Sequence, residues 1–283
     1  LARLTNVEGV NRKGKQFFEM NTNMTDNVNV VAVQDTKIFA SANYTYNVFD
    51  NEKEIAHLMM PAPINSMCLA PLTDRSSGLR TLLGCADRVI RVVHEDKVLE
   101  TVPVDGATQC LSLYHIRDRD AEKDTRARGS PTLDVVYGTD NGSLGMLMMP
   151  RNMAIAGGDV VADPENSEKE VVDEGKKEAA VLDLDFSPPT DDPGGQKSAI
   201  RRGWSIDAGM GKRKAAVNSM TSFDITADGT PDIIVGRNDG TLEVFGFDMG
   251  EECPKNQFET NIGESIRAIE CGEVSNAGFN EII

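Results

Sequence analysis

The stretch that decides the fold is VYGTDNG, residues 136–142, and it recurs along the chain. Close copies are LGCADRV at 83–89 and IVGRNDG at 234–240, and a weaker copy, IFAS, stands at 38–41. Alternating residues follow the phrase, as in TLEVF at 241–245, which is typical of a pleated strand. Asn-Gly and Asp-Gly supply the positive φ angles that a two-residue hairpin turn requires. The phrase therefore predicts two strands joined by a tight turn, made by Gly84, Asp87, Gly138, Asp140, Asn141, Gly142, Gly236, Asn238, Asp239 and Gly240.

The spacing of these copies indicates the architecture. Ala40 and Gly84 are 44 residues apart, and Gly138 follows after a further 54. Gly236 follows Gly138 after 98 residues, which is close to two periods. Periods of about 40 to 50 residues are typical of the four-stranded blades of a β-propeller. The chain is therefore predicted to be all-β, with four-stranded antiparallel blades.

Six blades are expected, of which the first and the last are incomplete. The first includes residues 15–18, and the last begins near Ser265 and continues to Ile283. The four blades between them are expected at residues 28–60, 64–104, 109–206 and 217–260. All six would form a single domain over residues 1–283. Because Leu1 is not an initiator methionine and both ends lie in predicted strands, we expect the chain to be part of a longer protein.

The long interval between Gly138 and Gly236 contains no second copy of the phrase. Residues 151–197 instead lose the alternation and are rich in Glu, Asp, Gly and Pro. Such a composition supplies too few apolar residues for a packed core. We expect an acidic, flexible insertion within the blade at 109–206.

The net charge and the cysteines argue against several classes of function. A formal net charge of −16 argues against general nucleic-acid binding, because Lys and Arg supply most of that affinity. The same charge disfavours non-specific binding to anionic lipid. Five cysteines without a C-x-x-C pair indicate buried small side chains in a reducing, cytoplasmic compartment. No stretch approaches the roughly 20 apolar residues that span a bilayer.

One acidic segment is similar to a calcium loop. Residues 224–232 (DITADGTPD) carry oxygen-bearing side chains at positions 1, 3, 5 and 9 and glycine at position 6. Calcium prefers about six to eight oxygen ligands, and the neutral Thr226 lowers the charge of the set. One interpretation is a metal site at Asp224, Asp228 and Asp232, and the other is a turn whose Asp side chains cap backbone amides. The related segment 273–281 has Ala277 where an oxygen is needed.

A basic cluster surrounds the only tryptophan, Trp204. Its members are Arg201, Arg202, Lys212, Arg213 and Lys214. One interpretation is a patch that binds a protein partner or a lipid headgroup. The other is a solvated loop whose cations balance the acidic insertion.

The sequence predicts no catalytic residue and no cofactor. The three histidines, His57, His94 and His115, have neither metal-ligand spacing nor a nucleophile motif beside them. Carboxylate pairs are so frequent in this acidic chain that none of them identifies acid–base chemistry.

Several phrases together resemble a known family. They are RKGKQF at 12–17, SANYTYN at 41–47, CADRVIRV at 85–92, and SFDI at 222–225 leading to VGRNDG at 235–240. In order and spacing they are similar to the amino-terminal propeller of the Bardet-Biedl syndrome protein 7 family. The resemblance covers nearly the whole chain apart from the insertion.

This resemblance implies a fold and a function. The family propeller is a seven-bladed ring, followed in the complete protein by a coiled coil and further β and helical domains. The family is a subunit of the BBSome, a coat-like complex that carries membrane proteins into and out of cilia with the intraflagellar transport machinery. The implied partners are the other BBSome subunits, especially the second Bardet-Biedl subunit. The implied location is the cytoplasm, the cilium and its base, peripheral to the ciliary membrane.

The function expected from this resemblance is a non-enzymatic scaffold, and two alternatives stay open. A secreted, calcium-binding propeller of the integrin type is motivated by Asp224, Asp228 and Asp232. A propeller glycosidase is motivated only by analogy of fold.

Overall fold

A computed structural model describes residues 5–71, 79–114, 132–150, 200–207, 214–248, 251, 253–275 and 278–283. These residues belong to one compact unit, Leu1–Met153 with Ala199–Ile283. The acidic insertion predicted at 151–197 lies outside the described residues. The described part of the chain consists of strands and their connections, and no helix in it is long and apolar enough to cross a membrane.

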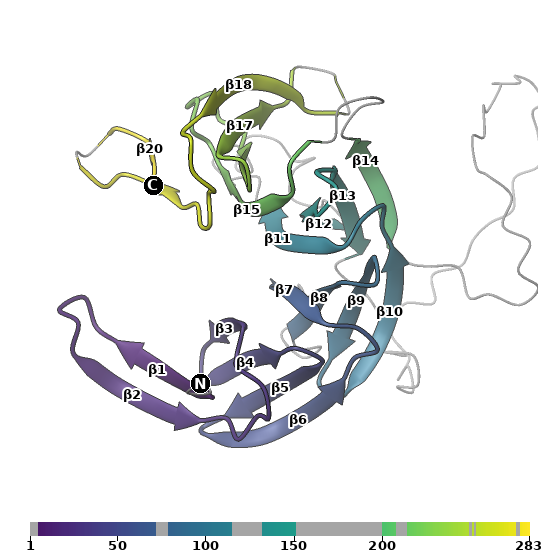
Figure 1. Ribbon diagram of the computed structural model, residues 1–283, viewed down its shortest axis with the longest axis vertical. Helices are drawn as coiled ribbons and strands as arrows, with labels where there is room; N and C mark the ends of the chain where they lie inside the picture. The colour runs from purple at the N-terminus through teal and green to yellow at the C-terminus, as the bar shows by residue number, and fades with distance from the viewer. Residues whose placement is uncertain are drawn as a thin grey trace, which may run out of the picture. The chain divides into compact units, whose positions relative to one another are not determined.

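The strands form six antiparallel sheets in chain order (Figure 1), which we number as blades 1 to 6. Blade 1 contains β1 (Asn6–Val10) and β2 (Gln16–Asn21). Blade 2 contains β3 (Val30–Gln34), β4 (Lys37–Ala42), β5 (Thr45–Asp50) and β6 (Lys53–Met59). Blade 3 contains β7 (Ile64–Pro71), β8 (Leu79–Cys85), β9 (Val89–His94) and β10 (Lys97–Pro103).

The remaining three blades follow the same order. Blade 4 contains β11 (Thr108–Tyr114), β12 (Thr132–Thr139), β13 (Leu144–Pro150) and β14 (Arg201–Ile206). Blade 5 contains β15 (Val217–Phe223), β16 (Asp232–Arg237), β17 (Thr241–Gly246) and β18 (Lys255–Asn261). Blade 6 contains β19 (Cys271–Gly272) and β20 (Glu281–Ile282). The four predicted complete blades and the two predicted partial blades therefore agree with the sheets.

Consecutive blades pack face to face. The first strand of each four-stranded blade contacts the first strand of the next, from β3 to β7, β11, β15 and then β19. Five apolar clusters fill the interfaces, and each takes its side chains from two consecutive blades. This stacking of small sheets is the packing of a β-propeller, because each sheet buries both faces on its neighbours. The predicted fold class is confirmed.

The second strand of each complete blade is buried on both sides. In β8, Leu82 packs between blades 3 and 4, whereas the adjacent Leu83 packs between blades 2 and 3. In β12, Val135 and Val136 divide in the same way between the interfaces on either side of blade 4. Successive side chains of a strand point to opposite faces, so a strand covered on both faces has apolar residues at consecutive positions in its middle. This explains why the recurring phrase begins with an unbroken apolar run.

The predicted hairpin turn needs one correction. Gly84, Gly138 and Gly236 lie inside β8, β12 and β16 and not in the turns. A Cβ added at Gly138 would lie 2.5 Å from Cγ1 of Val217 in blade 5, and one at Gly236 would lie 2.4 Å from Cγ2 of Ile266 before blade 6. Glycine is therefore required here by the close approach of the next blade and not by a turn.

The turns themselves are three residues long. Gly142 N donates to Thr139 O, and Thr139 N donates to Ser143 O, both at 3.1 Å. Among the described residues of this turn only Gly142 has a positive φ, of 86°, and Gly240 has the same role in blade 5 with 85°. The expected two-residue turn with positive φ at both positions is wrong, because a type I turn followed by one left-handed residue also fits the twist of the strands.

Candidate functional site

The predicted calcium loop connects β15 to β16, and its carboxylates are bound to backbone amides. Asp232 Oδ2 accepts hydrogen bonds from Ile225 N (3.1 Å), Thr226 N (3.1 Å) and Thr226 Oγ1 (3.0 Å). Asp224 accepts from Asp228 N and Gly229 N, each at 3.1 Å. These contacts are the capping turn that the sequence offered as the second interpretation.

Burial in this loop changes the pKa of Asp232. Asp232 is 1% exposed, and desolvation raises the pKa of its carboxyl group against the opposing effect of its hydrogen bonds. Within the described ranges no group of three or more His, Cys, Asp or Glu side chains has an arrangement suited to a metal ion. The loop therefore has the geometry of a structural cap, with its oxygens directed at its own backbone.

The same cap recurs in blade 6. Glu281 accepts hydrogen bonds from Val274 N (3.2 Å), Ser275 N (2.7 Å) and the Ser275 hydroxyl group. Its sequence offsets match those of Asp232, so segments 224–232 and 273–281 are equivalent loops. The two loops are joined directly, because Asn280 Nδ2 donates to Asp224 O at 2.8 Å.

The described members of the predicted basic patch do not surround an exposed Trp204. The Trp204 ring is 8% exposed and packs edge-on against Phe247 in the interface between blades 4 and 5, with ring centroids 6.2 Å apart. Arg202 donates to Pro103 O and lies 3.8 Å from Asp105, so it binds blade 3. Arg201 is exposed on β14, and Lys212 and Arg213 lie outside the described residues. The buried tryptophan therefore cannot serve as the surface anchor of such a patch.

Two of the three histidines lie on strands. His57 Nδ1 is 3.1 Å from Asn47 Oδ1, and His94 Nδ1 is 3.0 Å from Leu79 O. His115 lies outside the described residues. Both described histidines thus bind within their own blades.

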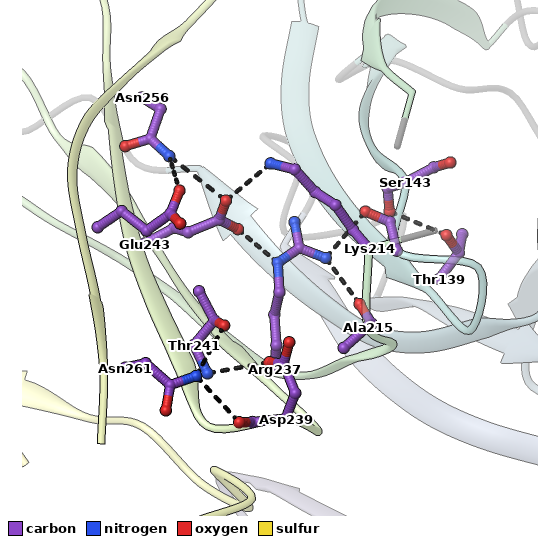
Figure 2. Close-up of polar contacts among 12 residues, drawn as sticks. Thr139, Ser143, Lys214, Ala215, Arg237, Asp239, Thr241, Glu243, Asn256 and Asn261 are labelled. Carbon is purple, nitrogen blue, oxygen red and sulfur yellow. Dashed lines mark hydrogen bonds and ion pairs between the residues drawn. The ribbon is translucent and has the colours of Figure 1, made fainter. Parts of the chain in front are cut away.

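A buried ionic network that the sequence analysis missed connects blades 4 and 5 (Figure 2). Arg237 at the end of β16 and Glu243 on β17 have side chains that are 2% and 1% exposed. Arg237 Nε donates to Glu243 Oε2 at 2.5 Å, and Lys214 Nζ donates to Glu243 Oε1 at 2.8 Å. Asn256 Nδ2 on β18 adds a hydrogen bond of 3.3 Å to the same Oε1.

The guanidinium group of Arg237 also crosses to the neighbouring blade. Its Nη1 donates to Gly142 O in the β12–β13 turn at 3.0 Å and to Ala215 O at 2.8 Å. A buried ion pair is retained only when further hydrogen bonds satisfy its remaining donors and acceptors, and this pair meets that condition. Because Arg237 of blade 5 is bonded both to Glu243 and to a carbonyl group of blade 4, the ion pair connects blades 4 and 5.

A sequence signal for this network exists. Arg237 is the first residue after Gly236, and the equivalent residues are Cys85 in blade 3 and Thr139 in blade 4. Glu243 is the seventh residue after Gly236, and the equivalent residues are Arg91 in blade 3 and Gly145 in blade 4. Charged residues at positions predicted to be buried need a partner. Alignment of the repeats therefore identifies the pair, although it does not give the carbonyl groups that Arg237 contacts.

Comparisons with known proteins agree with the repeat and the sheets. The family model described as BBS7 beta-propeller matches residues 1–182 and 195–283. The chain is 25% identical over 283 residues to the mouse BBSome complex member BBS7 and 24% identical over 287 residues to the Caenorhabditis elegans BBSome complex member bbs-7. Each match covers all of this chain and 31% of the relative, so the chain spans about a third of their length.

A solved structure is also similar in part. A crystal structure of BBS1N in complex with ARL6DN matches with a TM-score of 0.41 and 8% identity, over 92% of this chain and 74% of that one.

Proposed function

This chain belongs to the BBS7 β-propeller family, and from that membership we propose that it is a non-catalytic scaffold of the BBSome. In this role the propeller presents rigid surfaces and loops to neighbouring subunits, and binding depends on a few well-buried anchors. The observation that carries the proposal is the family match, which extends over residues 1–182 and 195–283.

Several charged side chains are bonded to groups within the protein, which supports a scaffold more than an enzyme. Asp224, Asp232 and Glu281 bind backbone amides, and Arg237 binds Glu243 and two carbonyl groups. General acid–base catalysis requires carboxyl groups that can reach a substrate. The groups named here instead hold loops and blades in place.

The proposal includes partners and a location. The partners are the other BBSome subunits, above all the second Bardet-Biedl subunit, and through the complex the membrane-protein cargo and the intraflagellar transport machinery. The location is the cytoplasm, the ciliary base and the cilium, peripheral to the ciliary membrane.

Affinity capture from ciliated cells tests this function. The tagged chain is expressed, and the recovered BBSome subunits are quantified by mass spectrometry. A variant changed at the exposed first residue of β6, Lys53→Glu, should recover them as the wild type does. Gly138→Val, which forces blade 5 away from blade 4, should recover fewer. Recovery of no BBSome subunit by the folded wild-type chain would exclude the proposal.

A further inference from the structure

A recurring side-chain amide joins consecutive blades. Asn65 and Asn218 are each the extra residue of a β-bulge near the start of the first strand of their blades. A bulge redirects the side chain of the extra residue. Asn65 Nδ2 donates to Thr108 O in blade 4 at 3.1 Å, and Asn218 Nδ2 donates to Ile266 O before blade 6 at 3.1 Å.

Blade 2 has the same contact. Asn29 stands immediately before β3, and its Nδ2 donates to Ile64 O at the start of blade 3 at 2.6 Å. The acceptor residue of the following blade also lies against a glycine of the second strand. Thr108, the acceptor for Asn65, lies against Gly84, and Ile266, the acceptor for Asn218, lies against Gly236. We call the amide and its carbonyl acceptor the amide latch of a junction.

The junction between blades 4 and 5 differs. The bulge residue of β11 is Gln109, whose side chain is one methylene longer. Among the described residues Val217 approaches Gly138 as expected, but no hydrogen bond from Gln109 to Val217 O is present. Near the β12–β13 turn a crossing contact is made from the opposite side, by Arg237 of blade 5 to Gly142 O of blade 4, while Tyr114 Oη of blade 4 donates to Pro231 O of blade 5 elsewhere in the junction.

We infer that Arg237, held in place by Glu243, is the latch of the junction between blades 4 and 5 near the β12–β13 turn, and that it replaces the amide used at the junctions between blades 2 and 3, 3 and 4, and 5 and 6. Arg237 is a positioning residue, because it fixes the β12–β13 turn against the segment that enters blade 5. The replacement makes this junction dependent on a buried charge. Removing Glu243 leaves the buried Arg237 without its carboxylate, and removing Arg237 leaves the buried Glu243 with Lys214 and Asn256 alone. Loss of an amide latch removes only a neutral hydrogen bond.

Hydrogen exchange measured by mass spectrometry tests the inference. In Arg237→Met, the amides of Thr139 and Gly142, which are hydrogen-bonded within the β12–β13 turn, should exchange at least about tenfold faster. Peptides from 64–70 should be unchanged. The matched control is Asn65→Ala, in which exchange should rise at 64–70 and 108–112 and not in the β12–β13 turn.

A second substitution distinguishes loss of the Arg237 latch from a general loss of stability of the folded chain. Gln109→Asn places a shorter amide at the bulge, within reach of Val217 O by analogy with Asn65 and Asn218. In the Arg237→Met background it should restore slow exchange at Thr139 and Gly142 by at least about threefold. If Arg237→Met does not fold, Glu243→Gln is measured on the same peptides with and without Gln109→Asn. Faster exchange spread equally over all junctions, or the absence of rescue by Gln109→Asn, would overturn the inference.

Discussion

At the scale of single residues, the glycines of the repeat show how much one missing methyl group matters. Gly138 is surrounded by Val217 and by the sulfur of Cys110, and an added Cβ would lie 2.5 and 2.8 Å from them. Gly246 also lies in a strand without positive φ, but its added Cβ would meet only the end of the flexible Gln257 side chain. The two glycines therefore form a matched pair.

We expect Gly138→Ala to destabilise the chain by about 1 to 3 kcal/mol, because the interface between blades 4 and 5 cannot accept the extra volume. Gly246→Ala should change stability by less than about 0.5 kcal/mol, since Gln257 can move into solvent. Urea denaturation followed by circular dichroism measures both. Equal effects of the two substitutions would contradict the close approach of the blades.

The buried carboxyl group of Asp232 gives a pH dependence. Its pKa is raised in the folded state by desolvation, so the folded chain binds this proton more tightly than the unfolded chain does. The stability contributed by Asp232 is therefore present at a pH below its unfolded pKa and is lost as the pH rises through the folded pKa. Asp232→Asn keeps an oxygen acceptor and cannot ionise.

We expect the stability of Asp232→Asn relative to the wild type to increase as the pH rises from acid values toward neutrality. The measurement is the difference in free energy of unfolding between the two proteins across this range. Asp224→Asn, at a half-buried position of the same loop, serves as the control. A difference that is independent of pH would show that Asp232 has an ordinary pKa.

At the scale of elements, the β15–β16 loop illustrates one pattern with two interpretations. The spacing of Asp224, Asp228 and Asp232 fits a metal loop, yet Asp224 and Asp232 are directed at backbone amides. The equivalent loop in blade 6 is capped by Glu281, and its position 5 is Ala277, which supplies no side-chain oxygen. A shared cap explains both loops, whereas a calcium site explains only the first.

Calcium should therefore leave the melting temperature unchanged. A ligand at 100 times its dissociation constant would stabilise the folded chain by about 2.7 kcal/mol, which is easily detected. Thermal melting with saturating Ca²⁺ and with EDTA makes the comparison, and Asp228→Ala controls for effects unrelated to the loop. A clear rise with Ca²⁺ that Asp228→Ala abolishes would restore the metal interpretation.

At the scale of the whole molecule, the net charge of −16 opposes compactness through self-repulsion. Exposed charges are screened at high salt, whereas the buried Arg237–Glu243 pair is screened much less. The melting temperature should therefore rise when NaCl is increased from low to moderate concentration. A fall would mean that exposed ion pairs, such as those of Lys255 with Asp248 and Glu251, contribute more than the repulsion costs.

The sequence predicted the fold at this scale because the period of the repeat is a property of one blade. Each four-stranded blade supplies a similar apolar run, as in residues 233–235, wherever it stands in the chain. The contacts between blades are less regular, and they depend on which residue meets a given carbonyl group. Trp204 shows this, since a binding patch was one of two interpretations of its basic neighbours, and its ring is buried against Phe247.

The fold class and the limits of the blades could be predicted from the sequence alone, because periodicity and turn residues are local properties of the chain. The family was indicated by the resemblance of several phrases in their order and spacing. Only the tertiary structure decided the role of Gly84, Gly138 and Gly236, the capping function of Asp232 and the partners of Arg237. The glycines and Arg237 depend on atoms far away in sequence, which the packing of neighbouring blades brings within about 3 Å, whereas the cap of Asp232 depends on how its own loop folds. The residues of one repeat are enough to predict a blade, whereas the partner of Arg237 in the next blade is known only once the blades are packed together.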